Sequence, residues 1–156
     1  MNNNQIKINS KIKKAIQNNK PIVALESTLI SHGLPYPDNI NVANESIKAV
    51  EKSGSIAATI GIINGIIKIG LNKDDIEILA STKNVEKVSL HNIALSLFNK
   101  KNAATTVAAT INIASKIGIN FFATGGIGGV HLDSEYNNDI SADLTELSRN
   151  KMFVVS

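Results

Sequence analysis

A continuous apolar run at residues 21–25, Pro-Ile-Val-Ala-Leu, constrains the fold of this 156-residue chain more than any other feature. A strand with one solvent-facing side alternates apolar and polar residues, whereas this run has no polar position. We therefore expect a strand that is buried on both faces of its sheet. The predicted helix before it is capped by Ser10. The predicted helix after it is capped by Asp38 or Asn39 and stops at Gly54.

A second apolar run, residues 56–63, ends in Asn64-Gly65, which between Ile pairs is the strongest short signal for a β-hairpin. Part of the sheet is therefore antiparallel. Residues 31–37 contain two prolines and a glycine, which predict an irregular loop. Strands alternate with helices along the rest of the chain, which is typical of α/β layers with a mixed, mostly parallel sheet. The other predicted strands are residues 84–89, 121–123 (buried) and 152–155, and the other predicted helices are one capped by Asn72, one at 92–100, one led by Thr105-Thr106 and one opened by Asp139.

Candidate functional groups lie near the ends of predicted strands, where the ligands of such sheets bind. Glu26 and Lys87 lie at or near strand ends, and so does the loop at residues 124–129, Thr-Gly-Gly-Ile-Gly-Gly. Four glycines within five positions leave little side chain to pack, and successive exposed amides there form a concave anion site, most naturally for phosphate. The alternative interpretation is an ordinary glycine-rich turn.

The helix predicted from Asp139 carries paired acidic residues close after the glycine loop. One interpretation is that these carboxylates and His131 act on a substrate. The alternative is that the acids only stabilise the helix dipole. Helical spacing gives the helix an apolar inner face of Ile140, Leu144 and Leu147 and an acidic face of Asp139, Asp143 and Glu146.

Composition excludes several classes of protein. Apolar residues make up 43% of the chain, as expected of a globular domain, and a net charge of +3 with 4% aromatic residues gives no platform for nucleic acid. There is no cysteine, which fits a reducing compartment. The first residues lack the apolar core of a signal peptide, and no segment is long and apolar enough to span a membrane. We expect a cytoplasmic protein.

Five motifs occur in order along nearly the whole chain: VALESTLISHGLPYP (23–37), NVEKVS (84–89), AATTVAAT (103–110), FATGGIGGVH (122–131) and DISADL (139–144). Together they resemble pseudouridine-5'-phosphate glycosidase, a family related to the indigoidine synthase A proteins. The resemblance implies an α/β/α core, manganese (Mn2+) dependence, a homotrimer and a cytoplasmic location. It also implies reversible cleavage of the C–C glycosidic bond of pseudouridine 5'-phosphate, giving uracil and ribose 5-phosphate.

The resemblance implies catalytic and substrate-binding roles in the first three motifs. Glu26 matches the proton donor, which a C–C glycosidic bond needs because the departing uracil carbon must be protonated. Lys87 matches a substrate-binding lysine, and an ammonium suits a phosphate dianion. Thr106 and Val107 match a substrate-contacting helix start. From the residues alone, a carboxylate that accepts backbone amides is favoured for Glu26 and a solvated surface side chain for Lys87. Ordinary helix capping is an equally good interpretation of Thr106 and Val107.

The last two motifs carry the remaining implied roles. Asp139 matches the metal ligand, and manganese prefers oxygen ligands such as one carboxylate with waters and substrate. Ser141, Ala142 and Asp143 match a stretch that contacts substrate. His131 lies in the glycine-loop motif and could donate to the phosphate.

The family's nucleophile has no counterpart among these residues. In the family, a lysine in an Ala-Gly-x-Lys pattern follows the strand that matches residues 152–155, and its amine opens the ribose and forms an imine. The sequence stops at Ser156, before that position, so we expect residues 1–156 to be the N-terminal part of one incomplete domain. We expect no catalysis by the chain alone, an apolar face or open sheet edge beside the last strand, and a separate C-terminal half as a partner.

Two other functions stay open. One is a non-catalytic remnant that binds phosphate esters, and the other is an unrelated phosphosugar enzyme with a similar glycine loop.

Overall fold

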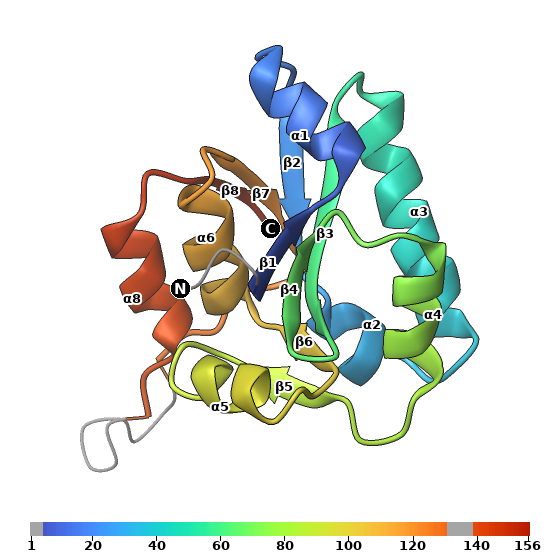
Figure 1. Cartoon of the computed structure of the whole chain (residues 1–156). Helices are drawn as coiled ribbons and strands as arrows, with labels where there is room; N and C mark the ends of the chain where they lie inside the picture. The colour runs from blue at the N-terminus through green and yellow to red at the C-terminus, as the bar shows by residue number, and fades with distance from the viewer. Residues whose placement is uncertain (1–4, 131–138) are drawn as a thin grey trace.

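The computed structural model describes residues 5–130 and 139–156, in which the strands form one eight-stranded sheet (Figure 1). None of the described helices is long and apolar enough to cross a membrane. The strands are β1 (Ile6–Ile8), β2 (Ile22–Leu25), β3 (Ile56–Ile63), β4 (Ile66–Ile69), β5 (Glu86–Val88), β6 (Ala103–Thr105), β7 (Phe121–Ala123) and β8 (Phe153–Val155). The helices are α1 (Ser10–Gln17), α2 (Thr28–His32), α3 (Asp38–Lys52), α4 (Lys73–Ser81), α5 (Ile93–Phe98), α6 (Val107–Ser115) and α8 (Ala142–Arg149).

Strand β3 organises the sheet because it pairs on both edges. One edge pairs with β4, which pairs in turn with β1. On the other edge, residues 56–59 run parallel to β2, whereas Gly61 and Ile62 run antiparallel to β6. The sheet therefore forks where β2 ends. On one branch β2 pairs with β7 and β7 with β8, and on the other branch β6 pairs with β5. Only the β3–β4 and β3–β6 pairs of the described strands are antiparallel, which confirms the mixed, mostly parallel sheet.

The turn between β3 and β4 is the predicted Asn64-Gly65 hairpin. Both residues have positive φ values, 51° at Asn64 and 72° at Gly65, as a two-residue turn of type I′ requires. A Cβ atom at position 65 would also lie 2.6 Å from the carbonyl oxygen of Leu97, so the packing admits only glycine.

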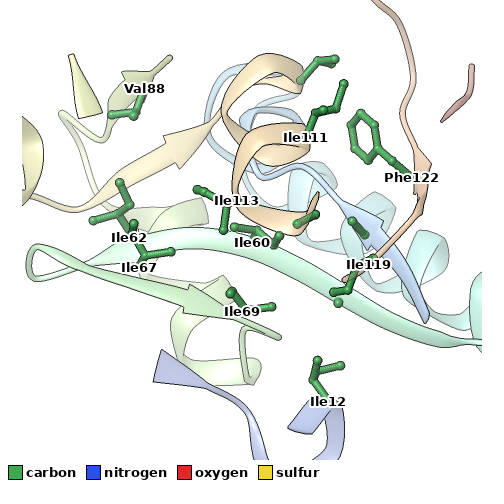
Figure 2. Close-up of a cluster of buried hydrophobic side chains, with 14 of the residues drawn as sticks. Ile12, Ile60, Ile62, Ile67, Ile69, Val88, Ile111, Ile113, Ile119 and Phe122 are labelled. Atoms are coloured by element: carbon green, nitrogen blue, oxygen red, sulfur yellow. The ribbon is translucent and has the colours of Figure 1, made fainter. Parts of the chain in front are cut away.

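Helices cover both faces of the sheet and give the three-layer α/β/α arrangement (Figure 1). Side chains of α1, α5 and α6 join one core cluster with the isoleucines of β3 and β4 (Figure 2). Side chains of α2, α3 and α4 form a second cluster on the opposite face. Helix α8 packs outside α6. Strand β2, predicted at residues 21–25, lies between these layers, with Ile22, Ala24 and Leu25 buried and Val23 half-buried.

Three local predictions are wrong. Helix α1 is capped by Asn9, whose side chain accepts a hydrogen bond from the amide of Lys11 at 2.9 Å, and Ser10 is already helical. The predicted loop at residues 31–37 begins later, because α2 extends to His32. Helix α3 already contains Asp38 and Asn39, the two predicted caps, and the residue at its cap position is Pro37. The helix predicted after Thr105-Thr106 is confirmed as α6 with Thr106 as its cap, but residues 103–105, to which no strand was assigned, form β6, because the edge of β3 beyond β2 offers them a pairing partner.

Helix α8 differs from its prediction in both start and orientation. It begins at Ala142 with Ser141 as its cap, and Glu146 of its predicted acidic face is buried, whereas Leu147 of its predicted apolar face packs partly buried against the core. Glu146 is 2% exposed and accepts a hydrogen bond from the side chain of Asn112 on α6 at 2.9 Å, whereas Ile140 is 54% exposed. A buried carboxylate is tolerated here because amide donors satisfy it.

The end of the sheet at β7 and β8 carries exposed apolar side chains on one face. The prediction that the strand at 121–123 is buried holds for Phe122 but is wrong for Phe121. The rings of Phe121 and Phe153 stack with their centroids 5.3 Å apart, and Val155 lies further along the same edge strand. We call Phe121, Phe153 and Val155 the open flank. The predicted exposed apolar face is therefore present.

Candidate active site

The C-terminal ends of strands β2 and β6 meet head to head at the fork of the sheet. Both strands pair with the same edge of β3, but β2 runs parallel to it and β6 antiparallel, so they point towards each other. Strand β7 ends beside β2, and β5 ends beside β6. The structure therefore gathers the loops that carry Glu26, Thr106 and Thr124 around one point, with Lys87 on β5 nearby.

A buried hydroxyl network joins the two strand ends behind Glu26. The amide of Thr105 donates to Ser27 Oγ at 2.9 Å, and Thr28 Oγ1 donates to the carbonyl of Thr105 at 2.7 Å. Thr105 Oγ1 donates in turn to the carbonyl of Ile60 at 2.7 Å and accepts from Thr110 Oγ1 at 3.0 Å. Ser27, Thr105 and Thr110 are fully buried, so the network holds the chain around Glu26 in one position.

Glu26 is a half-buried carboxyl group with perturbed acidity. Burial raises the pKa of Glu26 above its ordinary value, and the negative charge of Asp143 raises it further. Hydrogen bonds from Thr124 and Thr28 and the positive charge of Lys87 act in the opposite direction on the same pKa. The net upward direction favours the protonated acid, which is the form that a proton donor needs.

Asp143 connects the glycine loop to the start of helix α6. Its Oδ1 accepts the amide of Ala108 at 2.8 Å, and its Oδ2 accepts the amide of Gly128 at 2.9 Å. A Cβ atom at position 128 would lie 2.3 Å from Ser141 Oγ and 2.9 Å from Asp143 Oδ2. Gly128 therefore allows the loop to approach α8, and the Asp143 side chain holds the site together.

Part of the predicted anion site is already occupied by these contacts. Besides Gly128, the amide of Gly126 has a partner, Thr124 Oγ1, at 3.3 Å. Within residues 5–130 and 139–156, four other amides at the loop and at the start of α6 donate no hydrogen bond. They belong to Val107, Gly125, Ile127 and Gly129.

The remaining predicted residues lie around this loop. Lys87 is exposed, and Thr106 caps α6 by accepting the amide of Ala109 at 3.4 Å. Ser141 accepts the amide of Asp143 at 3.2 Å and donates its own amide to Gly129, and the exposed Ala142 opens α8. His131 lies outside the described residues.

Asp139 is exposed just ahead of α8. The neighbouring Ile140 forms an isolated antiparallel bridge with Val130 at the end of the glycine loop. Within the described ranges, no three His, Asp or Glu side chains gather into a metal-binding group.

An apolar groove opens next to Glu26, on the face of the sheet that α3 covers. Its volume is about 450 Å³, and its walls include Leu29, Val42 and Val50. Glu26, Thr124 and Gly125 also line it. The groove can take a flat, weakly polar group beside the acid.

Sequence reasoning missed the hydroxyl groups of the site. Ser27, Thr105 and Thr124 were not assigned roles, although all three lie within the quoted motifs. For Ser27 and Thr124 the available signal was their position within two residues of the end of a predicted strand, whereas the strand that ends at Thr105 was not predicted.

Comparison with known proteins gives consistent matches. The family model described as "Indigoidine synthase A like protein" matches residues 11–156. The pseudouridine-5'-phosphate glycosidases of Staphylococcus aureus and Mycoplasmopsis agalactiae are 51% and 49% identical over 150 residues, which is 96% of this chain and 49% and 50% of theirs. The crystal structure of the prealnumycin C-glycosynthase AlnA in complex with ribulose 5-phosphate is 42% identical with a TM-score of 0.87, covering 97% of this chain and 49% of that one. The chain thus spans about half the length of the relatives it matches.

Proposed function

Because the chain belongs to the indigoidine synthase A-like family, we propose that it forms the proton-donating and phosphate-binding part of a pseudouridine-5'-phosphate glycosidase. The reaction is the reversible cleavage of pseudouridine 5'-phosphate to uracil and ribose 5-phosphate. The observation that carries this proposal is the position of Glu26, a half-buried acid at the fork of the sheet with a raised pKa. The chain is 51% and 49% identical in sequence to two glycosidases of that name, which supports the choice of substrate.

We propose that Glu26 protonates the uracil carbon as the C–C bond breaks. A carbon leaving group departs only if it receives a proton, and a carboxyl group whose pKa is raised is more readily protonated and can supply one. The apolar groove beside Glu26 would take the uracil ring. Its walls are mostly apolar, and Glu26 beside it is half-buried, which raises the pKa of this carboxyl group.

We propose that the phosphate binds at the glycine loop. Lys87 supplies a positive charge, and the amides of Val107, Gly125 and Ile127 are available donors. The start of α8, with Ser141 and Ala142, adds a helix N-terminus to the same side of the loop. The related C-glycosynthase binds ribulose 5-phosphate, which supports a pentose 5-phosphate at this site. Asp143 contributes by holding the loop rather than through a free carboxylate.

We propose that Asp139 is the single protein carboxylate of a manganese site. Asp139 is exposed, so waters and substrate oxygens can complete an oxygen shell around an ion that it holds. When bound there, the ion would offset the negative charge of the phosphate. The homotrimer and the cytoplasmic location also stay predictions.

We propose that the imine-forming lysine comes from residues that correspond to the other half of the relatives. Every lysine of the chain lies in the described residues, and all are exposed except Lys68. Lys68 is paired with Asp75 at 2.5 Å, away from the groove. A nucleophilic amine needs a buried site that depresses its pKa. The open flank and the groove share β7, so the polypeptide that supplies the lysine would cover both.

Complementation tests this proposal. The chain would be mixed with a separately expressed segment of the S. aureus glycosidase that follows its region of similarity, and uracil release from pseudouridine 5'-phosphate would be followed. We expect no release by either part alone, release by the mixture, and a loss of at least about 100-fold with Glu26→Gln. Lys83→Gln, at an exposed position outside the site, is the matched control and should keep the activity.

A mixture that assembles without releasing uracil would contradict the glycosidase and favour the phosphate-ester-binding remnant. Titration calorimetry with ribose 5-phosphate on the same samples then separates the two parts of the proposal. Lys87→Ala should weaken binding with or without manganese, and Asp139→Ala should remove any dependence on manganese.

A further inference from the structure

The hydroxyl group of Thr124 lies between the acid Glu26 and the glycine loop. Thr124 Oγ1 is hydrogen-bonded to Glu26 Oε1, lies 3.0 Å from the carbonyl oxygen of Gly126, and accepts the amide of Gly126 at 3.3 Å. A threonine hydroxyl has a single proton to donate. It can therefore donate fully to only one of its two acceptors, the carboxyl group of Glu26 or the carbonyl of Gly126.

The protonation state of Glu26 decides which acceptor receives this proton. An ionised Glu26 only accepts hydrogen bonds, so Thr124 donates to it. A protonated Glu26 donates its own O–H to Thr124 Oγ1, and the threonine proton then turns to the carbonyl of Gly126. We propose that Thr124 is a positioning residue that couples the protonation state of Glu26 to the conformation of the glycine loop.

The packing of the loop allows such a response at Gly126 and opposes it at Gly128. Gly125 and Gly126 are exposed, and a Cβ atom built on either meets nothing within 4 Å. Gly128, by contrast, is held at Asp143 and packed against Ser141. One end of the loop is thus fixed, while the other is attached through the Thr124 hydroxyl.

The other groups around Glu26 do not contact Gly126 in the described structure. Asp143 on α8 and Lys87 on β5 act on Glu26 through their charges. Thr28 on α2 donates its hydroxyl to the carbonyl of Thr105 and also contacts Glu26. Among these groups, Thr124 alone also contacts the glycine loop at Gly126.

This inference rests on the proposed function for its role in the reaction. There, Glu26 loses its proton when uracil leaves, while the sugar phosphate is still bound. Thr124 would then turn from the Gly126 carbonyl to the carboxylate. The loop that binds the phosphate would thereby respond to whether the proton has been transferred.

Nuclear magnetic resonance on the full chain tests the coupling without substrate. The carboxyl carbon of Glu26 and the amide and carbonyl signals of Gly126 would be followed against pH, with Gly54, at the end of α3, as a remote reference. We expect the Gly126 signals to change with the same midpoint as Glu26, and Glu26→Gln to remove that change. Thr124→Val should remove it too and shift the Glu26 midpoint upwards, because a hydrogen bond that favours the carboxylate is lost. Thr124→Ser keeps the hydroxyl and should retain the coupling.

A merely structural role for Thr124 would leave the Gly126 titration unchanged in folded Thr124→Val, and that result would overturn the inference. Absence of any Gly126 response in the unsubstituted chain, or a response that persists in Glu26→Gln, would overturn it as well. The measurements on the unsubstituted chain and on Glu26→Gln can therefore overturn the inference even if Thr124→Val does not fold. A chain that shows the coupling but fails the complementation experiment would contradict the proposed function alone.

Discussion

The two sides of the sheet contain equally apolar strands but bury them very differently. In the β3–β4 hairpin, helices and strand β1 surround the side chains of Ile60, Ile62, Ile67 and Ile69 (Figure 2). We call these four residues the closed flank. At β7 and β8, α6 and its neighbours cover one face, and the opposite face carries the open flank. The exposed fraction is 0% at Ile60, Ile62, Ile67 and Ile69, and it is 51% at Phe121 and 70% at Phe153 and Val155.

The two flanks differ in what they contribute: one stabilises the fold, and the other borders the candidate site. The closed flank removes large apolar side chains from water completely, so it contributes most strongly to folding. The candidate site lies between the two flanks, where β2, β6 and β7 end. The residues that prepare Glu26 therefore rest on a stable hairpin on one side and on an incompletely covered surface on the other.

A substitution that opens the closed flank should have the largest effect. Ile67→Ala removes a fully buried side chain and leaves a cavity, so we expect a loss of about 2–5 kcal/mol in the free energy of unfolding. Phe153→Ala is the matched substitution in the open flank and should cost at most about 1.5 kcal/mol, from the lost ring stacking. Urea denaturation measures both. Equal losses at the two positions would contradict the difference between the flanks.

A substitution at the border between the flanks should have an intermediate effect. Gly128→Ala places a Cβ atom against Ser141 and Asp143, so the start of α8 must shift, at a cost of about 1–3 kcal/mol. Gly126→Ala, in the same loop, meets nothing within 4 Å and should change stability by less than about 0.5 kcal/mol. Thermal denaturation of the two variants compares them directly. A larger loss in Gly126→Ala would show that the Asp143 contact does not hold the loop.

Titration of Glu26 should give the smallest effect. Because burial raises its pKa above that in the unfolded chain, its contribution to stability is fully present below the unfolded pKa and is lost as the pH rises through the folded pKa. Glu26→Gln does not titrate. The stability of the unsubstituted chain relative to this variant should therefore fall as the pH rises over that window. Unfolding free energies of both proteins from pH 4 to 8 measure this difference, and a rise with pH would mean that the pKa of Glu26 is lowered instead.

Much of the fold could be read from the sequence because its signals are local. A continuous apolar run predicted β2, and the Asn64-Gly65 pair predicted the hairpin from the backbone angles that those residues favour. The capping box of α4 at Asn72 is likewise a matter of neighbouring residues. The motifs also located the segments that carry Glu26, Lys87 and the glycine loop. Each of these features depends on residues only a few positions apart.

Local signals were insufficient where burial depends on a distant partner. The sequence predicted an apolar inner face for α8, yet its buried residue is Glu146, because Asn112 on α6 offers an amide donor. Phe121 and Phe122 are identical side chains with opposite environments, since successive residues of a strand point to opposite faces and only one face is covered here.

The sequence by itself determined most of the elements, although not β1, α2 or β6, and the residue types available for proton donation and phosphate binding. Only the tertiary structure decided that β2 and β6 meet head to head on one edge of β3. That meeting brings Ser27 within hydrogen-bond distance of Thr105, 78 positions along the chain, and places Asp143 between Ala108 and Gly128. The physical reason is that pairing between distant segments is chosen by the shared edge of the sheet and by the burial of its faces, which no short stretch of sequence specifies.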